Sequence, residues 1–170
     1  MRSAIVLAAG KGTRMKSSLN KVMHPVSNKP MIGHIVSSLR KAGVENIVVV
    51  VGHGAESVKE YLGDSVQYAL QEPQLGTGHA VMQAQCLKDL DGDTLILCGD
   101  GPCIQSETIE QAFAANENSE MTVLTALLPD GERYGRIVRN SKGDVEKIVE
   151  AKDCTPQQLE IKEINTGIFC

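Results

Sequence analysis

The sequence predicts an α/β fold in which a mostly parallel sheet carries helices on both of its faces. Two observations lead to this prediction. Short, continuous apolar runs recur along the first 128 residues, as expected of strands that are buried on both faces. Segments with apolar residues at helical spacing separate these runs, and such alternation builds a parallel sheet. Ligands of such sheets bind at the carboxyl ends of the strands.

The individual elements follow from periodicity and from turn residues. We expect strands over residues 4–8, 47–51, 66–70, 94–98 and 121–128. Helices are expected over residues 30–42, 55–62 and 77–87, with a fourth beginning near residue 106. Pro30 suits the first position of its helix, Gly43 ends that helix, and Thr77 and Ser106 are plausible N-caps.

The pattern changes after Pro129. Residues 136–139 and 145–150 are expected to form two strands, with a turn at residues 140–143 between them. Thr155 and Pro156 can begin a short helix, and residues 164–170 form a last strand. Because the chain stops inside this apolar run, we expect residues 1–170 to be one domain that is incomplete at its C-terminus.

Charge is distributed unevenly along the chain. The net charge is −4, yet residues 1–41 carry eight of the 17 Lys and Arg residues and no acidic residue. A basic segment on an acidic chain indicates a local anionic ligand and argues against nucleic-acid binding. No apolar run approaches the ~18 residues of a membrane span, so we expect a cytoplasmic protein without a membrane partner. Five cysteines without a CxxC pair indicate reduced thiols.

A loop suited to phosphate follows the first expected strand. Ala8, Ala9, Gly10 and Gly12 are small, so a ligand could approach the main chain closely and accept from its N–H groups. Arg14 and, further on, Lys21 add positive charge. The segment is neither a Walker loop nor a GxGxxG dinucleotide loop. A tight strand-to-helix turn would account for the same glycines.

An ordered set of motifs makes the interpretation more specific. It comprises Leu7-Ala8-Ala9-Gly10-x-Gly12-Thr13-Arg14-Met15 with Lys21-Val22, Gln71, Leu75-Gly76-Thr77-Gly78-His79-Ala80, Gly99-Asp100-x-Pro102, Tyr134-Gly135-Arg136, Val149-Glu150-x-Lys152-Asp153 and Glu163-Ile164-Asn165-Thr166-Gly167. This set resembles the sugar nucleotidyltransferases, and within them the N-acetylglucosamine-1-phosphate uridylyltransferases, which form the N-terminal domain of a bifunctional bacterial enzyme. The resemblance implies a Rossmann-like fold of the nucleotide-diphospho-sugar transferase type.

The resemblance assigns a role to each matching residue. Arg14 and Lys21 would be catalytic contacts of the phosphates. The nucleotide would bind to Leu7, Ala8, Ala9, Gly10, Lys21, Gln71, Gly76, Thr77, Cys98, Gly99 and Asp100. Gln71, Gly76 and Thr77 would read uracil, and a Gln side chain has the donor and the acceptor that this requires. Gly135, Glu150 and Asn165 would hold the sugar phosphate.

The resemblance also implies Mg²⁺ on Asp100, which follows an apolar strand at its carboxyl end. A turn Asp before Pro102 would account for the same residue. The family's second metal-binding residue, an Asn, lies beyond Cys170. Cys98 stands where an aromatic residue is common and Gly101 where an apolar one is usual. The four histidines lack metal-ligand spacing, and we expect His79 to pack within its helix.

The implied reaction joins UTP to N-acetylglucosamine 1-phosphate and releases pyrophosphate. We expect the family's C-terminal acetyltransferase domain to be absent from this chain. Two alternatives stay open: a fragment that binds UTP or a UDP-sugar with little turnover, and a nucleotidyltransferase for another sugar 1-phosphate.

Overall fold

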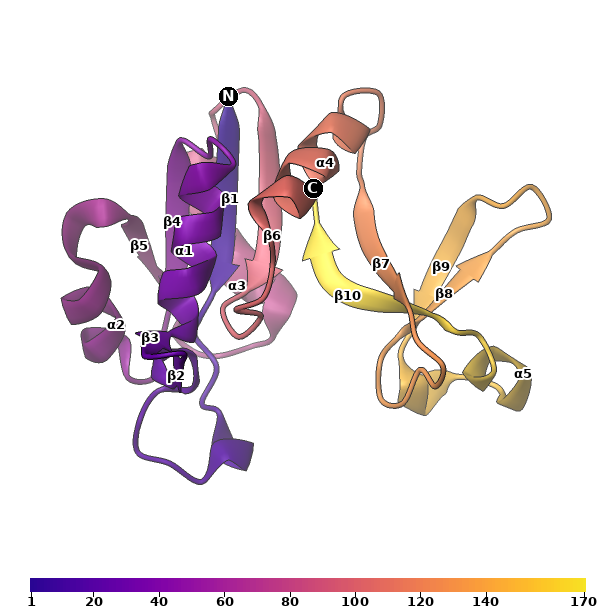
Figure 1. The fold of residues 1–170 in the computed structure, drawn as a ribbon, viewed down its shortest axis with the longest axis horizontal. Coiled ribbons are helices and arrows are strands. Elements are labelled where there is room, and N and C mark those ends of the chain that lie inside the picture. The colour runs from indigo at the N-terminus through magenta and orange to yellow at the C-terminus, as the bar shows by residue number, and fades with distance from the viewer. The chain divides into compact units, whose positions relative to one another are not determined.

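The computed structural model describes residues 1–170 apart from the side chain of Arg14, and it consists of two compact units. The N-terminal unit comprises residues 1–122 together with Cys170, and the C-terminal unit comprises residues 123–169. Figure 1 labels the α-helices and strands of both units.

The N-terminal unit is built on four parallel strands. They are β1 (Arg2–Leu7), β4 (Asn46–Val51), β5 (Gln67–Leu70) and β6 (Asp93–Cys98), in the order β5-β4-β1-β6. The strand β1 pairs with β4 and β6, and β4 pairs with β5. These strands confirm the predicted parallel sheet. All four carboxyl ends therefore lie along one edge, where the sequence predicts the ligand.

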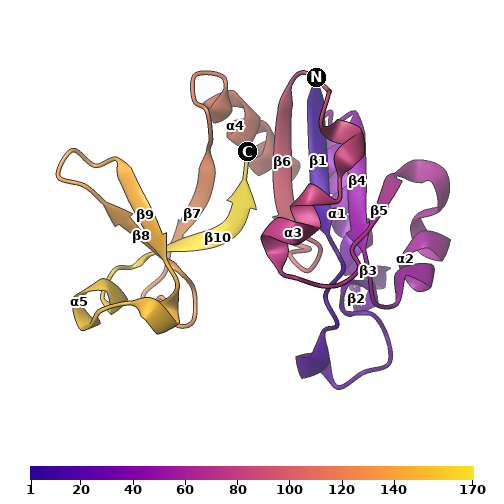
Figure 2. The same cartoon turned by 180° about the vertical axis from the view of Figure 1, so that it is seen from behind.

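Helices cover both faces of this sheet. The helices α1 (Met31–Lys41) and α4 (Ser106–Asn116) lie on one face (Figure 1), and α3 (Thr77–Met82) lies on the other (Figure 2). Alternating side chains supply the two cores. On the α3 side, Ile5, Val48 and Val50 pack with residues of and after α3. The helix α2 (Ala55–Leu62) lies beside α1, where Gly33 leaves room for the ring of Tyr61.

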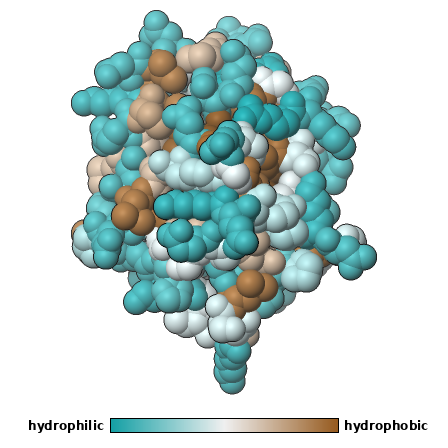
Figure 3. All heavy atoms as spheres, turned by 90° about the vertical axis from the view of Figure 1, so that its left-hand side faces the viewer, coloured by the Kyte–Doolittle hydropathy of each residue, from teal (hydrophilic) through white to brown (hydrophobic). Residues whose placement is uncertain are grey.

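The face that carries α2 and β5 is mainly hydrophilic, with its apolar side chains in small separate patches (Figure 3). Tyr61 and Leu70 are among the exposed apolar residues of these elements. Isolated residues of this kind are normal on a folded surface. In the described part of the chain, no helix combines the length and the apolar character that a bilayer crossing requires.

Several short elements were not predicted from the sequence. Two-residue strands β2 (Pro25–Val26) and β3 (Lys29–Pro30) pair with each other. Five single-turn 3₁₀ helices are η1 (Thr13–Met15), η2 (Lys21–Met23), η3 (Gly63–Ser65), η4 (Gln85–Leu87) and η5 (Ala151–Asp153). Such turns lack the length that a periodic pattern needs in order to be recognised.

The structure corrects the predicted helix starts. Pro30 lies at the N-cap position, one residue before the first helical residue of α1, and makes no capping hydrogen bond, while Gly43 ends α1 with a φ of 72°, as expected. Thr77 and Ser106 are the first helical residues after Gly76 and Gln105, and neither hydroxyl caps its helix. Gly76 makes the turn into α3 with a φ of 102°, which suits glycine. The helix predicted to reach residue 87 ends at Met82.

The C-terminal unit is antiparallel throughout. Its strands are β7 (Val123–Leu127), β8 (Arg136–Arg139), β9 (Val145–Val149) and β10 (Glu163–Phe169), in the order β7-β10-β8-β9. The sequence placed the strand at 121–128 in the parallel series, which is wrong, because β7 runs antiparallel to β10. Apolar periodicity identifies a strand without fixing the direction of its neighbour.

Other predictions for this unit are confirmed. A turn at residues 140–143 joins β8 to β9. Thr155 caps α5 (Pro156–Leu159) in a reciprocal capping box with Gln158, and Pro156 is the first helical residue.

Candidate functional site

A cavity of about 370 Å³ opens at the carboxyl edge of the parallel sheet. It gathers residues from the ends of β1, β5 and β6, from η2 and from the start of α3. Its lining is Leu7, Ala8, Ala9, Gly10, Lys21, Val22, Gln71, Gln74, Gly76, Thr77, Ala80, Cys98 and Asp100. Of the predicted nucleotide contacts, this lining includes all but Gly99. Residues up to 93 positions apart in the chain thus meet because parallel strands end at one edge.

The loop after β1 is held by its neighbouring strands. Ala8 N–H donates to Val50 O at 2.8 Å, and Leu7 O accepts from Gly99 N–H at 2.8 Å. Among the residues that the structure describes, none accepts from the N–H groups of Ala9 and Gly10. The loop therefore offers two main-chain donors to an anion.

Gly99 is needed where β6 approaches β1. A Cβ at this position would lie 2.9 Å from Val22 Cγ1 and 3.0 Å from Leu7 O. Both distances are shorter than ordinary van der Waals contact, so a larger residue would push the β1 loop away from β6. Gly99 is not a lining residue, but it affects the shape of the cavity because it lets β6 lie close to the β1 loop.

Gln74 is a cavity residue that the sequence did not single out. Its Nε2 donates to Ala9 O at 2.5 Å and so ties the segment before α3 to the β1 loop. Gly52 also lies close to this side chain, since a Cβ on Gly52 would be 2.8 Å from the same Nε2. In the sequence, the position of Gln74 one residue before the motif that begins at Leu75 could have indicated that it belongs to the site.

Lys21 and Asp100 form an ion pair at the mouth of the cavity, and their side chains are 32% and 34% exposed. The 3₁₀ turn η2 presents Lys21, and Asn20 caps this turn by accepting from Val22 N–H at 3.1 Å. Asp100 follows β6 directly after Gly99. The predicted phosphate contact and the predicted metal ligand thus neutralise each other here.

A magnesium site would have to be built around one carboxylate. In the described residues no three His, Cys, Asp or Glu side chains are grouped as metal ligands. Mg²⁺ is commonly held by one or two carboxylates together with substrate phosphates. Asp100 therefore fits a metal that arrives with a triphosphate, and does not by itself form a permanent metal cage.

The predicted phosphate contact Arg14 lies outside the described residues, because its side chain is not described. A second cavity, of about 470 Å³, borders the same loop and is lined by Gly10, Gly12, Thr13, Met15 and Lys21. Gly12 has a φ of 58°, and a Cβ on it would lie 2.8 Å from Lys21 Cβ. The glycine therefore lets this loop pass close to Lys21.

Gln71 is buried at the end of β5, with 5% of its surface exposed. Its Nε2 donates to Gly76 O at 2.8 Å and lies 3.2 Å from Nδ1 of His79. Gly76 and Thr77 are exposed beside it. The three residues predicted to read uracil are therefore neighbours, and the ring of His79 contacts one of them.

Cys98 lies at the end of β6 in the cavity wall. Desolvation raises the pKa of its thiol, and the negative charge of Asp100 raises it further, while Lys21 acts in the opposite direction. The thiol is therefore neutral at pH 7 and offers a small, weakly polar surface to a ligand. All five cysteines are free, as the sequence predicted.

The predicted sugar-phosphate residues lie together within the C-terminal unit. Asn165 N–H donates to Gly135 O at 2.8 Å, and a Cβ on Gly135 would lie 3.4 Å from Glu150 Oε1. Asn165 Oδ1 accepts from Gly167 N–H at 2.9 Å. The set comprises one exposed carboxylate, one amide and a buried glycine.

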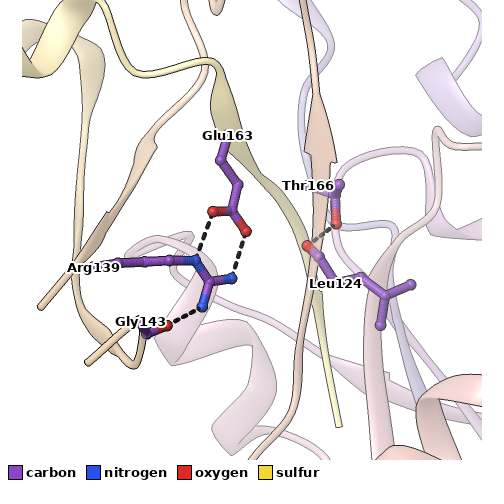
Figure 4. Close-up of polar contacts among 5 residues, drawn as sticks. All are labelled: Leu124, Arg139, Gly143, Glu163 and Thr166. Carbon is purple, nitrogen blue, oxygen red and sulfur yellow. Dashed lines mark hydrogen bonds and ion pairs between the residues drawn. The ribbon is translucent and has the colours of Figure 1, made fainter. Parts of the chain in front are cut away.

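Two groups of contacts support this set. Arg136, at 2% exposure, donates to the carbonyl oxygens of Gly131, Glu132, Tyr134 and Leu159. In β10, Glu163 accepts two hydrogen bonds from Arg139, at 2.6 and 2.8 Å, and Thr166 donates to Leu124 O at 2.7 Å (Figure 4). Together these contacts fix the turn before Gly135 and both flanks of Asn165.

These features define the class of the protein. A family model described as the MobA-like NTP transferase domain matches residues 4–149. The chain belongs to this family. The matches confirm the resemblance that the ordered motifs indicated.

Individual relatives are more specific. The bifunctional protein GlmU of Geobacillus thermodenitrificans is 56% identical over 99% of the chain, and that of Limosilactobacillus reuteri is 54% identical over 99%. The chain spans 38% of the length of each. A solved UDP-glucose pyrophosphorylase complexed with UDP-glucose matches with a TM-score of 0.82 at 20% identity, covering 99% of this chain and 75% of the other. This match confirms the predicted fold class.

Proposed function

We propose that this chain carries a sugar-1-phosphate uridylyltransferase activity, with UTP and N-acetyl-α-D-glucosamine 1-phosphate as substrates. The products would be UDP-N-acetylglucosamine and pyrophosphate. The observation that carries the proposal is the cavity at the carboxyl edge of the parallel sheet. It combines main-chain donors, a cation, a carboxylate and a buried amide, which are the groups that a nucleoside triphosphate requires.

Base recognition falls to the β5–α3 connection. Gln71 Oε1 would accept from uracil N3–H, since its Nε2 is already used by Gly76. Main-chain N–H groups of Gly76 and Thr77 would donate to a uracil carbonyl oxygen. Uracil presents its N3–H donor between two carbonyl acceptors, so an acceptor flanked by donors complements this edge of the base.

Phosphate recognition falls to the β1 loop and to Lys21. The N–H groups of Ala9 and Gly10 would donate to phosphate oxygens, and Arg14 would add a guanidinium. Lys21 neutralises Asp100 in the structure, and we expect its ammonium group to turn to phosphate when nucleotide binds. Mg²⁺, when bound with the triphosphate, would supply further positive charge against phosphate repulsion, and Asp100 is the residue that would hold it.

The sugar phosphate would bind to Gly135, Glu150 and Asn165. Glu150 would accept from sugar hydroxyl groups, and Asn165 would use the amide hydrogens that its bond to Gly167 leaves available. Gly135 would offer its main-chain N–H. These three roles rest on the motif match together with the proximity of the residues.

The reaction would be an in-line displacement. An oxygen of the sugar phosphate forms a bond to the α-phosphorus of UTP, and the bond from that phosphorus to the bridging oxygen breaks. Pyrophosphate leaves with the electron pair. Because the nucleophile is already anionic, no side chain has to remove a proton. Alignment of the two substrates supplies much of the acceleration, with effective molarities of ~10⁵ M or more in favourable cases.

Pyrophosphate release tests this proposal. The 170-residue chain is incubated with UTP, N-acetylglucosamine 1-phosphate and Mg²⁺, and glucose 1-phosphate and CTP are tested in parallel. We expect release with the first pair and little with the others. UTP binding without pyrophosphate would indicate a nucleotide-binding part that does not turn over. Activity with another sugar phosphate would change the assigned substrate.

A further inference from the structure

The amide of Gln71 has a fixed orientation. Its Nε2 lies 2.8 Å from Gly76 O, and a main-chain carbonyl oxygen can only accept. The nitrogen, and not Oε1, must therefore point toward Gly76. Gln71 is 5% exposed, so a free rotation of this amide would require neighbouring groups to move.

The second hydrogen of the same amide points to His79. Nδ1 of His79 lies 3.2 Å from Gln71 Nε2, and two hydrogens are all that an amide nitrogen has. Nδ1 must accept here, so the ring is neutral and carries its proton on Nε2. Both donors of Gln71 are thus occupied within the protein.

We propose that His79 is a positioning residue that sets the choice of nucleobase through Gln71, an inference that rests on the proposed function. With both hydrogens occupied, Gln71 presents only Oε1 to the cavity. This acceptor faces a donor in the N3–H of uracil. At the same position cytosine presents the lone pair of N3, which an oxygen acceptor repels.

Loss of the His79 acceptor releases one amide hydrogen. While its other amide hydrogen stays on Gly76 O, Gln71 can then offer the released hydrogen as a donor to a bound base, and this change favours cytosine relative to uracil. A single neutral hydrogen bond is worth enough to alter a binding ratio by about three- to tenfold. A histidine that only packed within α3 would affect the affinities for the two nucleotides equally.

Three variants separate these possibilities. H79L removes the acceptor at similar size, and H79N returns an acceptor oxygen near the position of Nδ1. The control is Q83L, because Gln83 Nε2 donates to the main-chain oxygen of His79 at 2.8 Å and, among the described residues, makes no hydrogen bond to Gln71. It perturbs the same turn of α3 while leaving the amide of Gln71 intact.

Affinities of the folded chain for UTP and CTP are measured by titration calorimetry, and thermal melting checks the fold. We expect the UTP-to-CTP ratio to fall about three- to tenfold in H79L, to recover in H79N and to stay at the wild-type value in Q83L. A wild-type ratio in H79L, or an H79N ratio as low as that of H79L, would overturn the role of His79. A wild-type protein that binds no nucleotide would overturn the proposed function itself.

A spectroscopic measurement on the wild-type chain needs neither nucleotide nor variant. Nitrogen-15 NMR of the His79 ring should show a protonated Nε2 and an unprotonated Nδ1 that is coupled through a hydrogen bond to the Gln71 amide. The opposite tautomer, with the proton on Nδ1, would refute the role of His79 even if the chain were a uridylyltransferase.

Discussion

Replacing Asp100 by Asn should change nucleotide affinity in opposite directions with and without metal. In the structure Asp100 is paired with Lys21 at the mouth of the cavity. Without metal, the carboxylate repels a triphosphate and also occupies the lysine that should bind it. The D100N variant removes both effects at nearly constant shape.

The magnitude follows from the exposure of the pair. Two unit charges about 4 Å apart interact with roughly 4 kcal/mol at an effective dielectric constant near 20. Because about a third of each side chain is exposed, solvent screening reduces the expected net value to about 1 kcal/mol. This corresponds to about a fivefold tighter binding of UTP by D100N in EDTA.

Titration calorimetry with UTP, in EDTA and in Mg²⁺, measures both effects. Wild-type affinity should rise on addition of Mg²⁺, and D100N should gain far less. The matched control is D91N, since Asp91 is an exposed residue before the amino end of β6 and its replacement changes the net charge equally. If D100N binds UTP no better than wild type in EDTA and responds to Mg²⁺ equally, the reasoning about Asp100 is refuted.

Three further predictions concern stability and reactivity. Gly99→Ala should lower the free energy of unfolding by about 1–3 kcal/mol, because the added Cβ overlaps the β1 loop, whereas Gly101→Ala meets no neighbour within 4 Å and should be tolerated. Alkylation of Cys98, which is an exposed residue, should be slow at pH 7–8 and accelerate at higher pH, because local desolvation raises the pKa of its thiol, and UTP should protect it. The hydrogen bonds from Arg139 lower the pKa of Glu163, so their stabilising effect should be complete above the unfolded value of about 4.3 and disappear as the pH falls through the lower folded value.

Each of these predictions has a direct check. Chemical denaturation compares the two glycine variants, and equal stabilities would contradict the proposed overlap. Mass spectrometry follows the Cys98 peptide against the peptides of Cys86 and Cys103, which are exposed like Cys98, and an equal rate at pH 7 would contradict the raised pKa. The stability difference between wild type and Glu163→Gln should shrink on acidification, and a difference independent of pH would exclude the pair as its source.

Much of the fold follows from periodicity because its strands are short and buried. The apolar run at residues 4–8 and the helix at residues 55–62 could be located closely, since each is bounded by turn residues. The direction of β7 could not be obtained in this way. Strand polarity depends on which distant segment lies beside β7, and that information is not local.

Some residues of the candidate site could be predicted from the local sequence, whereas others depend on contacts between segments that are distant in the chain. A strand followed by Gly or Asp predicts polar groups at one sheet edge, and the structure brings them to one cavity. The contacts of Gln74 and His79 depend on the approach of the β5–α3 connection to the β1 loop and to Gln71. Such side-chain contacts are set by the path of a loop, which residue types alone do not specify.

Arg136 places a charged side chain in the interior of the C-terminal unit. Its single guanidinium group joins the start of β8, the turn at residues 131–134 and the last residue of α5. Three stretches that are separate in the chain are therefore held together by hydrogen bonds from one guanidinium group. A shift of any one of them would break at least one of these bonds. The substrate contact proposed for neighbouring Gly135 would therefore be held in place by a residue that itself need not touch the substrate.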